Sequence, residues 1–170
     1  MTDSSINIIM VNTPEGAKHY VTLTSQRTVF SVGVIPEAIL GVLERPEEPI
    51  APGNFTANSI FRKFLADVIA RNGPDDPDMQ AAAAQQGQGY VAVIDQRTPT
   101  PEDQVPPEDI MGIFEVKDGK VVPGSYQASP NHRLLTNDGF FRLGRFLDGR
   151  LQQELAARAN DPPKSNDPGA

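Results

Sequence analysis

Cysteine is entirely missing from this 170-residue chain. Its absence excludes disulfides, thiolate nucleophiles, and zinc or iron–sulfur sites built on cysteine. A cysteine-free chain suits a reducing compartment, and the first residues lack the basic start and long apolar segment of a secretory signal. No apolar run reaches the roughly 20 residues needed to cross a bilayer. We therefore predict a cytoplasmic protein that does not enter a membrane.

Basic residues are also scarce. Lys and Arg number 15 against 22 Asp and Glu, which gives a net charge of −7. The densest basic group, Arg142, Arg145 and Arg150, lies among acidic residues on a predicted helix. Nucleic-acid binding depends on clustered cations that release counterions from phosphates, so we expect no nucleic-acid partner.

Motifs that would identify a common chemistry are lacking. We find no phosphate-binding loop, dinucleotide glycine fingerprint, nucleophile elbow or zinc-protease helix. A transition-metal site would need both histidines, His19 and His132, with a carboxylate, and their spacing lends this no support. The acidic clusters at 45–49 and 74–78 lack the spacing of a calcium loop. We predict neither a metal nor a cofactor.

Length and composition indicate one domain, since 170 residues match a single core. We place this domain at 5–159. The ends, 1–4 and 160–170, are polar and rich in Pro, Ser, Asp and Asn, and we expect disordered tails there.

The first half of the chain shows strand patterns followed by helical ones. Apolar residues recur at helical spacing along 56–73, where Thr56 or Asn58 can cap and Gly73-Pro74 stops the helix. Pro36 suits the first turn of a shorter helix. We predict strands at 6–12, 19–25 and 28–35, and helices at 36–44 and 56–73.

In the second half of the chain, the sequence predicts a hairpin formed by two apolar segments. Asp118-Gly119 accepts the positive φ angles of a type I′ turn, and Pro123 cannot donate within a central strand. Asn137 or Asp138 is a suitable N-cap for the last helix. We predict a short helix or loop at 74–88, a strand at 89–97, a proline-rich loop at 98–109, the hairpin at 110–129, and a helix at 138–159.

Together these elements follow the order β-β-β-α-α-β-β-β-α. That order predicts an α+β fold with a largely antiparallel sheet of about five to six strands and two main helices packed on one face.

Four residues are candidates for a functional site. His132 can act as a general base, with Arg133 binding an anion and Asp138 orienting the imidazole. Asp95 ends an apolar strand, where functional groups often lie, and its neighbour Arg97 can pair with it. Turn and capping chemistry explains the same residues without any reaction, and we favour that structural interpretation.

Two functions from different classes remain. The favoured one is a non-catalytic protein-interaction or assembly module that forms a homodimer, since a hairpin with an edge strand and a leucine-rich last helix could pair with a second copy. The alternative is a small-molecule hydrolase or ligand-binding domain with a pocket near His132, Arg133 and Asp95. Because the favoured hypothesis is non-catalytic, we expect that the protein is not an enzyme.

Overall fold

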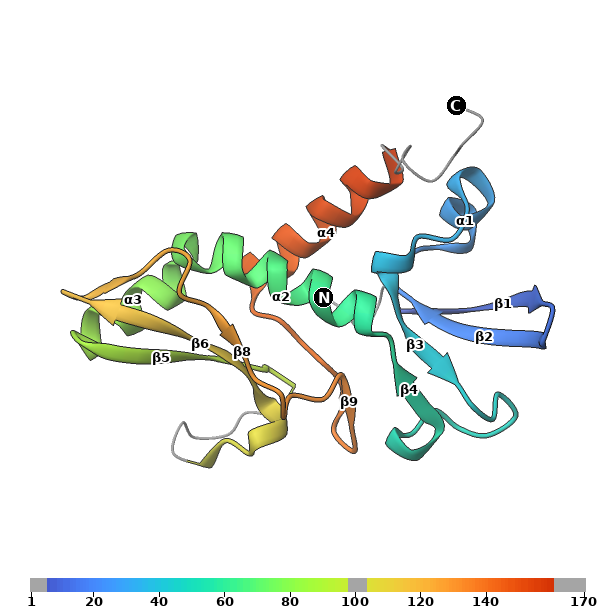
Figure 1. The fold of residues 1–170 in the computed structure, drawn as a ribbon, viewed down its shortest axis with the longest axis horizontal. Helices are drawn as coiled ribbons and strands as arrows, with labels where there is room; N and C mark the ends of the chain where they lie inside the picture. Colours follow the sequence, from blue (N-terminus) through green and yellow to red (C-terminus); the bar gives the residue numbers. More distant parts are fainter. Residues whose placement is uncertain (1–5, 98–103, 161–170) are drawn as a thin grey trace.

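The computed structural model describes residues 6–97 and 104–160 (Figure 1). The predicted tails lie outside these ranges apart from Asn160, and so does the first half of the predicted proline-rich loop. The described chain has four α-helices and mostly antiparallel strands, which confirms the α+β class. None of its helices is long and apolar enough to cross a membrane.

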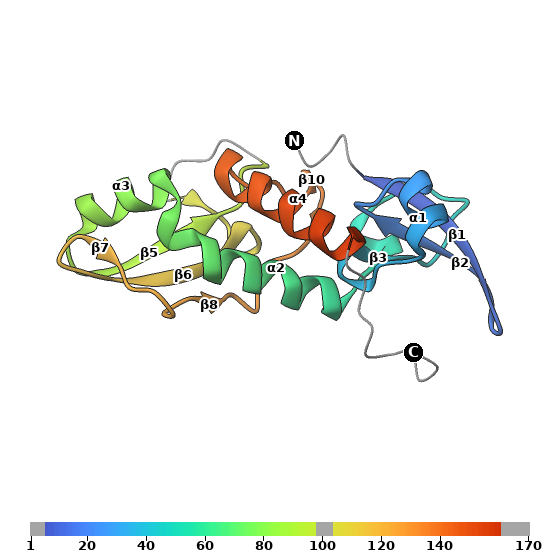
Figure 2. The same cartoon turned by 90° about the horizontal axis from the view of Figure 1, so that it is seen from above.

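The strands form two separate four-stranded sheets and one short ladder, so the prediction of a single sheet is wrong. Helix α2 (Ser59–Asn72) separates the sheets along the chain, and its 14 residues span about 21 Å. Figures 1 and 2 show α2 and α4 (Arg145–Asn160) across the middle of the molecule, with one sheet towards each end. Buried residues of both sheets and of three of the four described helices form one continuous core.

The N-terminal sheet has the order β1-β2-β3-β4, with antiparallel pairing throughout. A two-residue turn, Pro14-Glu15, joins β1 to β2. The first strand lies close to its predicted bounds, whereas the second starts three residues earlier than predicted and ends at Thr22. The four strands are β1 (Asn7–Thr13), β2 (Gly16–Thr22), β3 (Ile39–Leu43) and β4 (Phe55–Ala57).

Two predictions between β2 and β4 are wrong. Residues 28–32 of the segment predicted as a strand at 28–35 belong to helix α1 (Gln26–Val32), which Ser25 caps by accepting a hydrogen bond from Thr28 N. The predicted helix at 36–44 is a 3-10 turn, η2 (Pro36–Ala38), followed by strand β3. Strand β3 lies between two partners, where an apolar run can be buried on both faces.

Strand β3 needs a glycine at position 41 because β4 approaches it closely there. A Cβ atom at this position would lie 2.2 Å from the carbonyl oxygen of Thr56 and 2.6 Å from the ring of Phe55. The glycine therefore allows β4 to pair closely with β3, a requirement invisible in a helical interpretation of the same residues.

Helix α2 is confirmed close to its predicted bounds. The side chain of Asn58 accepts a hydrogen bond from Ile60 N at 3.2 Å, as expected of an N-cap. One side of the helix is buried, through Phe61, Phe64, Leu65, Val68 and Ile69. A 3-10 turn, η4 (Gly73–Asp75), then leads into α3 (Pro77–Gln86), which settles the ambiguous alanine-rich segment as a helix.

Asp76 caps α3, and its substitution by Asn is expected to maintain or raise stability at neutral pH. Its carboxylate accepts a hydrogen bond from Asp78 N at 2.9 Å, while burial raises the pKa of Asp76. The folded state then binds a proton more readily than the unfolded state, so this group's contribution to stability falls as pH rises through that raised pKa. Asn keeps the accepting oxygen without the charge.

Urea denaturation of Asp76→Asn across the acidic-to-neutral pH range, beside Asp76→Ala, tests this. Asp76→Ala should lose about 1 kcal/mol because the cap is gone. If Asp76→Asn loses as much at neutral pH, the charge itself stabilises the helix terminus and the expectation is wrong.

The second sheet has β5 (Gly89–Ile94) paired with β6 (Ile110–Lys117), which pairs in turn with β7 (Lys120–Val121) and β8 (Gln127–Ala128). The predicted hairpin turn is confirmed: Asp118 and Gly119 have φ angles of 52° and 73°. Strand β7 stops before Pro123, as the missing N–H requires.

The last helix starts later than predicted. Residues 138–144 are not helical: β9 (Leu135–Thr136) and β10 (Gly139–Phe140) form a ladder, and Phe141 N donates to Leu134 O at 2.7 Å. Gly139, with a φ of 106°, turns the chain out of the helical region. Asp138 is therefore a turn residue, and the predicted N-cap role of Asn137 or Asp138 is wrong.

The leucines between residues 143 and 155 are buried in the core. All four are at most 5% exposed and belong to the common core: Leu143, Leu147, Leu151 and Leu155. These leucines are therefore not exposed for pairing with a second copy, the role expected of the leucine-rich last helix.

Candidate functional site

Four ionisable side chains meet in the interior, where charge is expensive to bury. Asp95 and Arg97 follow β5, Asp109 ends the 3-10 turn η6 (Pro107–Asp109) before β6, and His132 lies between β8 and β9. Their side chains are between 0% and 6% exposed. Each comes from a loop or a strand end, so the cluster depends on tertiary structure.

Arg97 is the centre of this cluster. Its Nη2 lies 2.8 Å from Asp95 Oδ2, and its Nε lies 3.0 Å from Asp109 Oδ1. Its guanidinium also donates to three backbone carbonyls: Gly139 O at 3.0 Å, Arg133 O at 2.6 Å and Glu108 O at 3.2 Å. One cation therefore balances two carboxylates and joins three loop segments.

Asp95 uses both oxygens. Oδ2 forms an ion pair with Arg97 Nη2 and lies 2.9 Å from His132 Nε2, while Oδ1 accepts from the backbone N–H groups of Arg97 at 3.1 Å and Arg142 at 2.9 Å. The tautomer with its proton on Nε2 allows His132 to donate to Asp95. The carboxylate is thus fully hydrogen-bonded, as a buried charge must be.

The His132 side chain is buried, and the space beside it is too small for a substrate. The ring is buried, Nε2 is held by Asp95, and the backbone carbonyl accepts from Arg62 Nη1 at 2.9 Å. A cleft of about 30 Å³ adjoins the residue beside α2. That volume suits about one water molecule rather than an organic substrate.

The structure brings only some predicted site residues together. His132 and Asp95 are in contact, and Arg97 pairs with Asp95 as expected from their proximity. The side chains of Arg133 and Asp138 are exposed and belong to a different surface. Asp138 uses its backbone N–H to donate to Thr136 Oγ1 and makes no hydrogen bond to His132 within the described chain.

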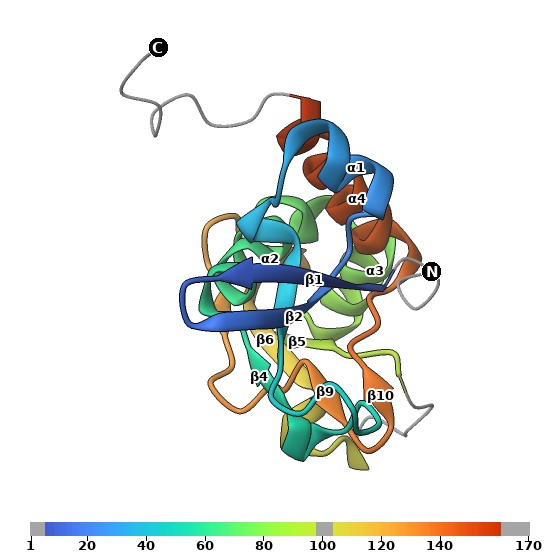
Figure 3. The same cartoon turned by 90° about the vertical axis from the view of Figure 1, so that its right-hand side faces the viewer.

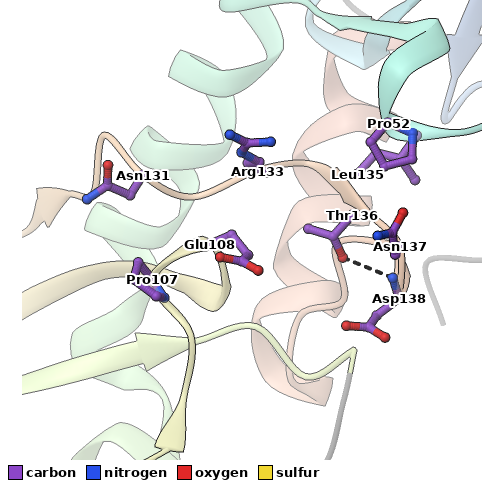
Figure 4. A pocket seen from close by; sticks show the side chains of 9 residues that line it. All are labelled: Pro52, Pro107, Glu108, Asn131, Arg133, Leu135, Thr136, Asn137 and Asp138. Atoms are coloured by element: carbon purple, nitrogen blue, oxygen red, sulfur yellow. Dashed lines mark hydrogen bonds between the residues drawn. The ribbon is translucent and has the colours of Figure 1, made fainter.

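That surface is a polar hollow of about 600 Å³ (Figure 4). Its walls are the 3-10 turn before β4, the 3-10 turn η6, the segment between β8 and β9, and β9 with the turn that follows it. The cluster around Arg97 lies behind it, because Arg97 binds the carbonyl groups of Glu108 and Arg133. Its lining residues are Pro52, Pro107, Glu108, Asn131, Arg133, Leu135, Thr136, Asn137 and Asp138.

His19 lies elsewhere. It is on β2, opposite Met10 of β1 and Leu43 of β3, in the N-terminal sheet. Within residues 6–97 and 104–160, no group of three His, Asp or Glu side chains is arranged to hold a metal ion.

Sequence reasoning missed Asp109 and Glu108. Both lie in the proline-rich stretch, where adjacent acids usually face solvent, and only the position of Pro107 at a helical N1 hinted at an ordered turn. The convergence of Arg97 on three carbonyls has no local signal, since its partners are 11 to 42 positions away.

Comparison with family models, with curated proteins and with solved structures returns no match. Function must therefore be argued from the geometry of this chain.

A second candidate surface is the outer edge of β1. This seven-residue strand carries no charge and pairs with β2 on one side only; no other described strand pairs with it. Ile8 is 42% exposed and Met10 is 61% exposed. Figure 3 looks onto this end of the molecule, where β1 and β2 project as a ribbon with α1 and α4 stacked above.

Proposed function

We propose that the protein is a non-catalytic assembly module that forms a homodimer by pairing β1 with β1 of a second copy. The observation that carries this proposal is the uncharged, apolar edge of β1. An exposed strand of this kind presents unpaired N–H and C=O groups that another strand can bind, and folded monomers usually protect such edges with Lys, Pro or a bulge.

The sequence of β1 suits pairing with itself. An antiparallel pair centred on Met10 places Ile9 opposite Val11 and Ile8 opposite Asn12. No like charges face each other, and apolar side chains occupy the middle of the ladder. A two-fold axis through this pair gives the closed symmetry common among soluble oligomers.

The buried cluster supports a structural role better than a catalytic one. Asp95 fully engages His132 Nε2, and the adjoining cleft is too small for an organic substrate. Arg97 and its partners join loops instead, which is the arrangement expected of a rigid binding scaffold.

The variant Met10→Lys is expected to convert a dimer into a monomer. A lysine at the centre of the strand would place two like charges opposite each other in the paired edge. Size-exclusion chromatography with light scattering, at high micromolar concentration, should give twice the monomer mass for the wild type and the monomer mass for the variant.

Tyr90→Lys is the matched control. Tyr90 is 57% exposed on β5, which ends the other sheet, so the same charge is added at another edge strand. The control should remain dimeric. A monomeric wild type, or dissociation by Tyr90→Lys with Met10→Lys unaffected, would refute pairing through β1.

A further inference from the structure

We propose that the polar hollow binds a small zwitterion, a molecule with a carboxylate and an ammonium group, as in amino acids and short peptides. The inference does not depend on dimerisation, because none of the lining residues belongs to β1. It rests on the separation of an unpaired cation from two unpaired anions around one cavity.

Arg133 supplies the cationic side. Its side chain is exposed and makes no hydrogen bond or ion pair with any described residue. Its backbone is fixed at both ends, since its N–H donates to Glu108 O at 3.2 Å and its carbonyl accepts from Arg97 at 2.6 Å. A guanidinium on fixed backbone can bind a carboxylate through two parallel hydrogen bonds.

Glu108 and Asp138 supply the anionic side. Neither carboxylate forms an ion pair with Arg133 or with another residue in the described ranges. Figure 4 shows the two acids on different segments, η6 and the turn between β9 and β10, around the same hollow as Arg133. Opposite charges that line one cavity without meeting leave room for a ligand between them.

The charge balance selects the ligand class. One guanidinium and two carboxylates give the lining a net negative charge, within a chain of net charge −7. A simple anion is therefore repelled, whereas a zwitterion satisfies Arg133 with its carboxylate and the acids with its ammonium group. The amides of Asn131 and Asn137 add donors and acceptors for a peptide group.

The size and rigidity of the hollow are also suited to a small ligand. A cavity of about 600 Å³ lies in the range typical of small-ligand sites. The cluster around Arg97 holds two of its walls by their carbonyl groups, so the site is formed before the ligand arrives. This role gives a reason for burying four ionisable groups that would otherwise cost stability.

Isothermal titration calorimetry with four probes tests the proposal on the full chain. Glycine and triglycine are zwitterions, N-acetylglycine carries only the carboxylate, and glycinamide carries only the ammonium group. At least one zwitterion should bind, with an affinity at least about tenfold above both singly charged probes. Preference for triglycine identifies a peptide site, and preference for glycine identifies an amino-acid site.

The variant Arg133→Met should weaken binding of the preferred zwitterion at least about tenfold, and Glu108→Gln should weaken it while improving N-acetylglycine. Arg145→Met, at an exposed arginine of α4 outside the hollow, should bind as the wild type does. Failure of every probe, equal binding of N-acetylglycine, or no effect of Arg133→Met would overturn the proposal.

The monomer Met10→Lys distinguishes this inference from the proposed function. It should bind the preferred zwitterion with wild-type affinity, since its substitution lies on β1. Binding lost in that variant would contradict a site formed within one copy.

Discussion

Arg97→Met is expected to lower the free energy of unfolding by about 3–5 kcal/mol, the cost of removing one partner from a buried ion pair. Its side chain is 2% exposed and lies within 3.0 Å of both Asp95 and Asp109. Methionine fills much of the space but removes the charge that faces both buried carboxylates. It also removes the donors to the carbonyl groups of Glu108, Arg133 and Gly139.

Chemical denaturation measures this loss, and thermal unfolding should show a fall in Tm of roughly 6–20 °C for a chain of this size. Arg145→Met is the matched control. Arg145 is exposed on α4, so the same substitution should change stability by no more than about 0.5 kcal/mol. Equal stability of the two variants would mean that Arg97 does not hold the loops together.

Phe141→Ala is expected to cost about 3–5 kcal/mol as well, for a different reason. The ring is completely buried, and its centroid lies 5.6 Å from that of Phe61 on α2. It anchors the segment between β10 and α4 to the core, where loss of the ring removes apolar burial and leaves a cavity.

Phe30→Ala provides the comparison. Phe30 lies on α1 and is 92% exposed, so its removal should leave the free energy of unfolding within about 0.5 kcal/mol. Urea denaturation of both variants at one pH measures the difference. A Phe141→Ala variant as stable as Phe30→Ala would show that the packing around α2 does not depend on this ring.

Local patterns predicted some elements well. Helix α2 combines a capping Asn58, a regular apolar stripe and a Gly-Pro stop, and all three signals act within a few residues. The Asp118-Gly119 turn depends only on the φ angles that these two residues accept. Both were predicted because the physical cause lies inside the segment.

Other segments were decided by their partners. The residues of β3 have helical spacing, but β2 and β4 pair with them on both sides, and Gly41 lets Phe55 approach. Residues 138–144 match a helix until β9 pairs with β10 and Phe141 bonds to Leu134. Tertiary contacts outweighed propensities worth less than about 1 kcal/mol per residue.

For the candidate site as well, some residues could be predicted from the sequence and their long-range contacts could not. From the sequence, Asp95 at a strand end and the polar residues 131–138 stood out as groups capable of chemistry. The pairing of Arg97 with Asp95 was expected because the two residues are neighbours in the sequence. The sequence could not show that His132, 37 positions from Asp95, lies in contact with it, or that Arg97 reaches Gly139 across 42 positions. Only the fold could show that His132 faces the buried cluster while Arg133, its neighbour, faces the hollow.

The sequence by itself determined the α+β class, the position of α2, the Asp-Gly hairpin and the exclusion of cysteine chemistry, since each depends on composition or on neighbouring residues. The tertiary structure alone decided that the strands split into two sheets, that the leucines of α4 are buried, and that β1 keeps a free edge among the described strands. The physical reason is that burial and pairing are properties of distant segments in contact, which local patterns do not encode.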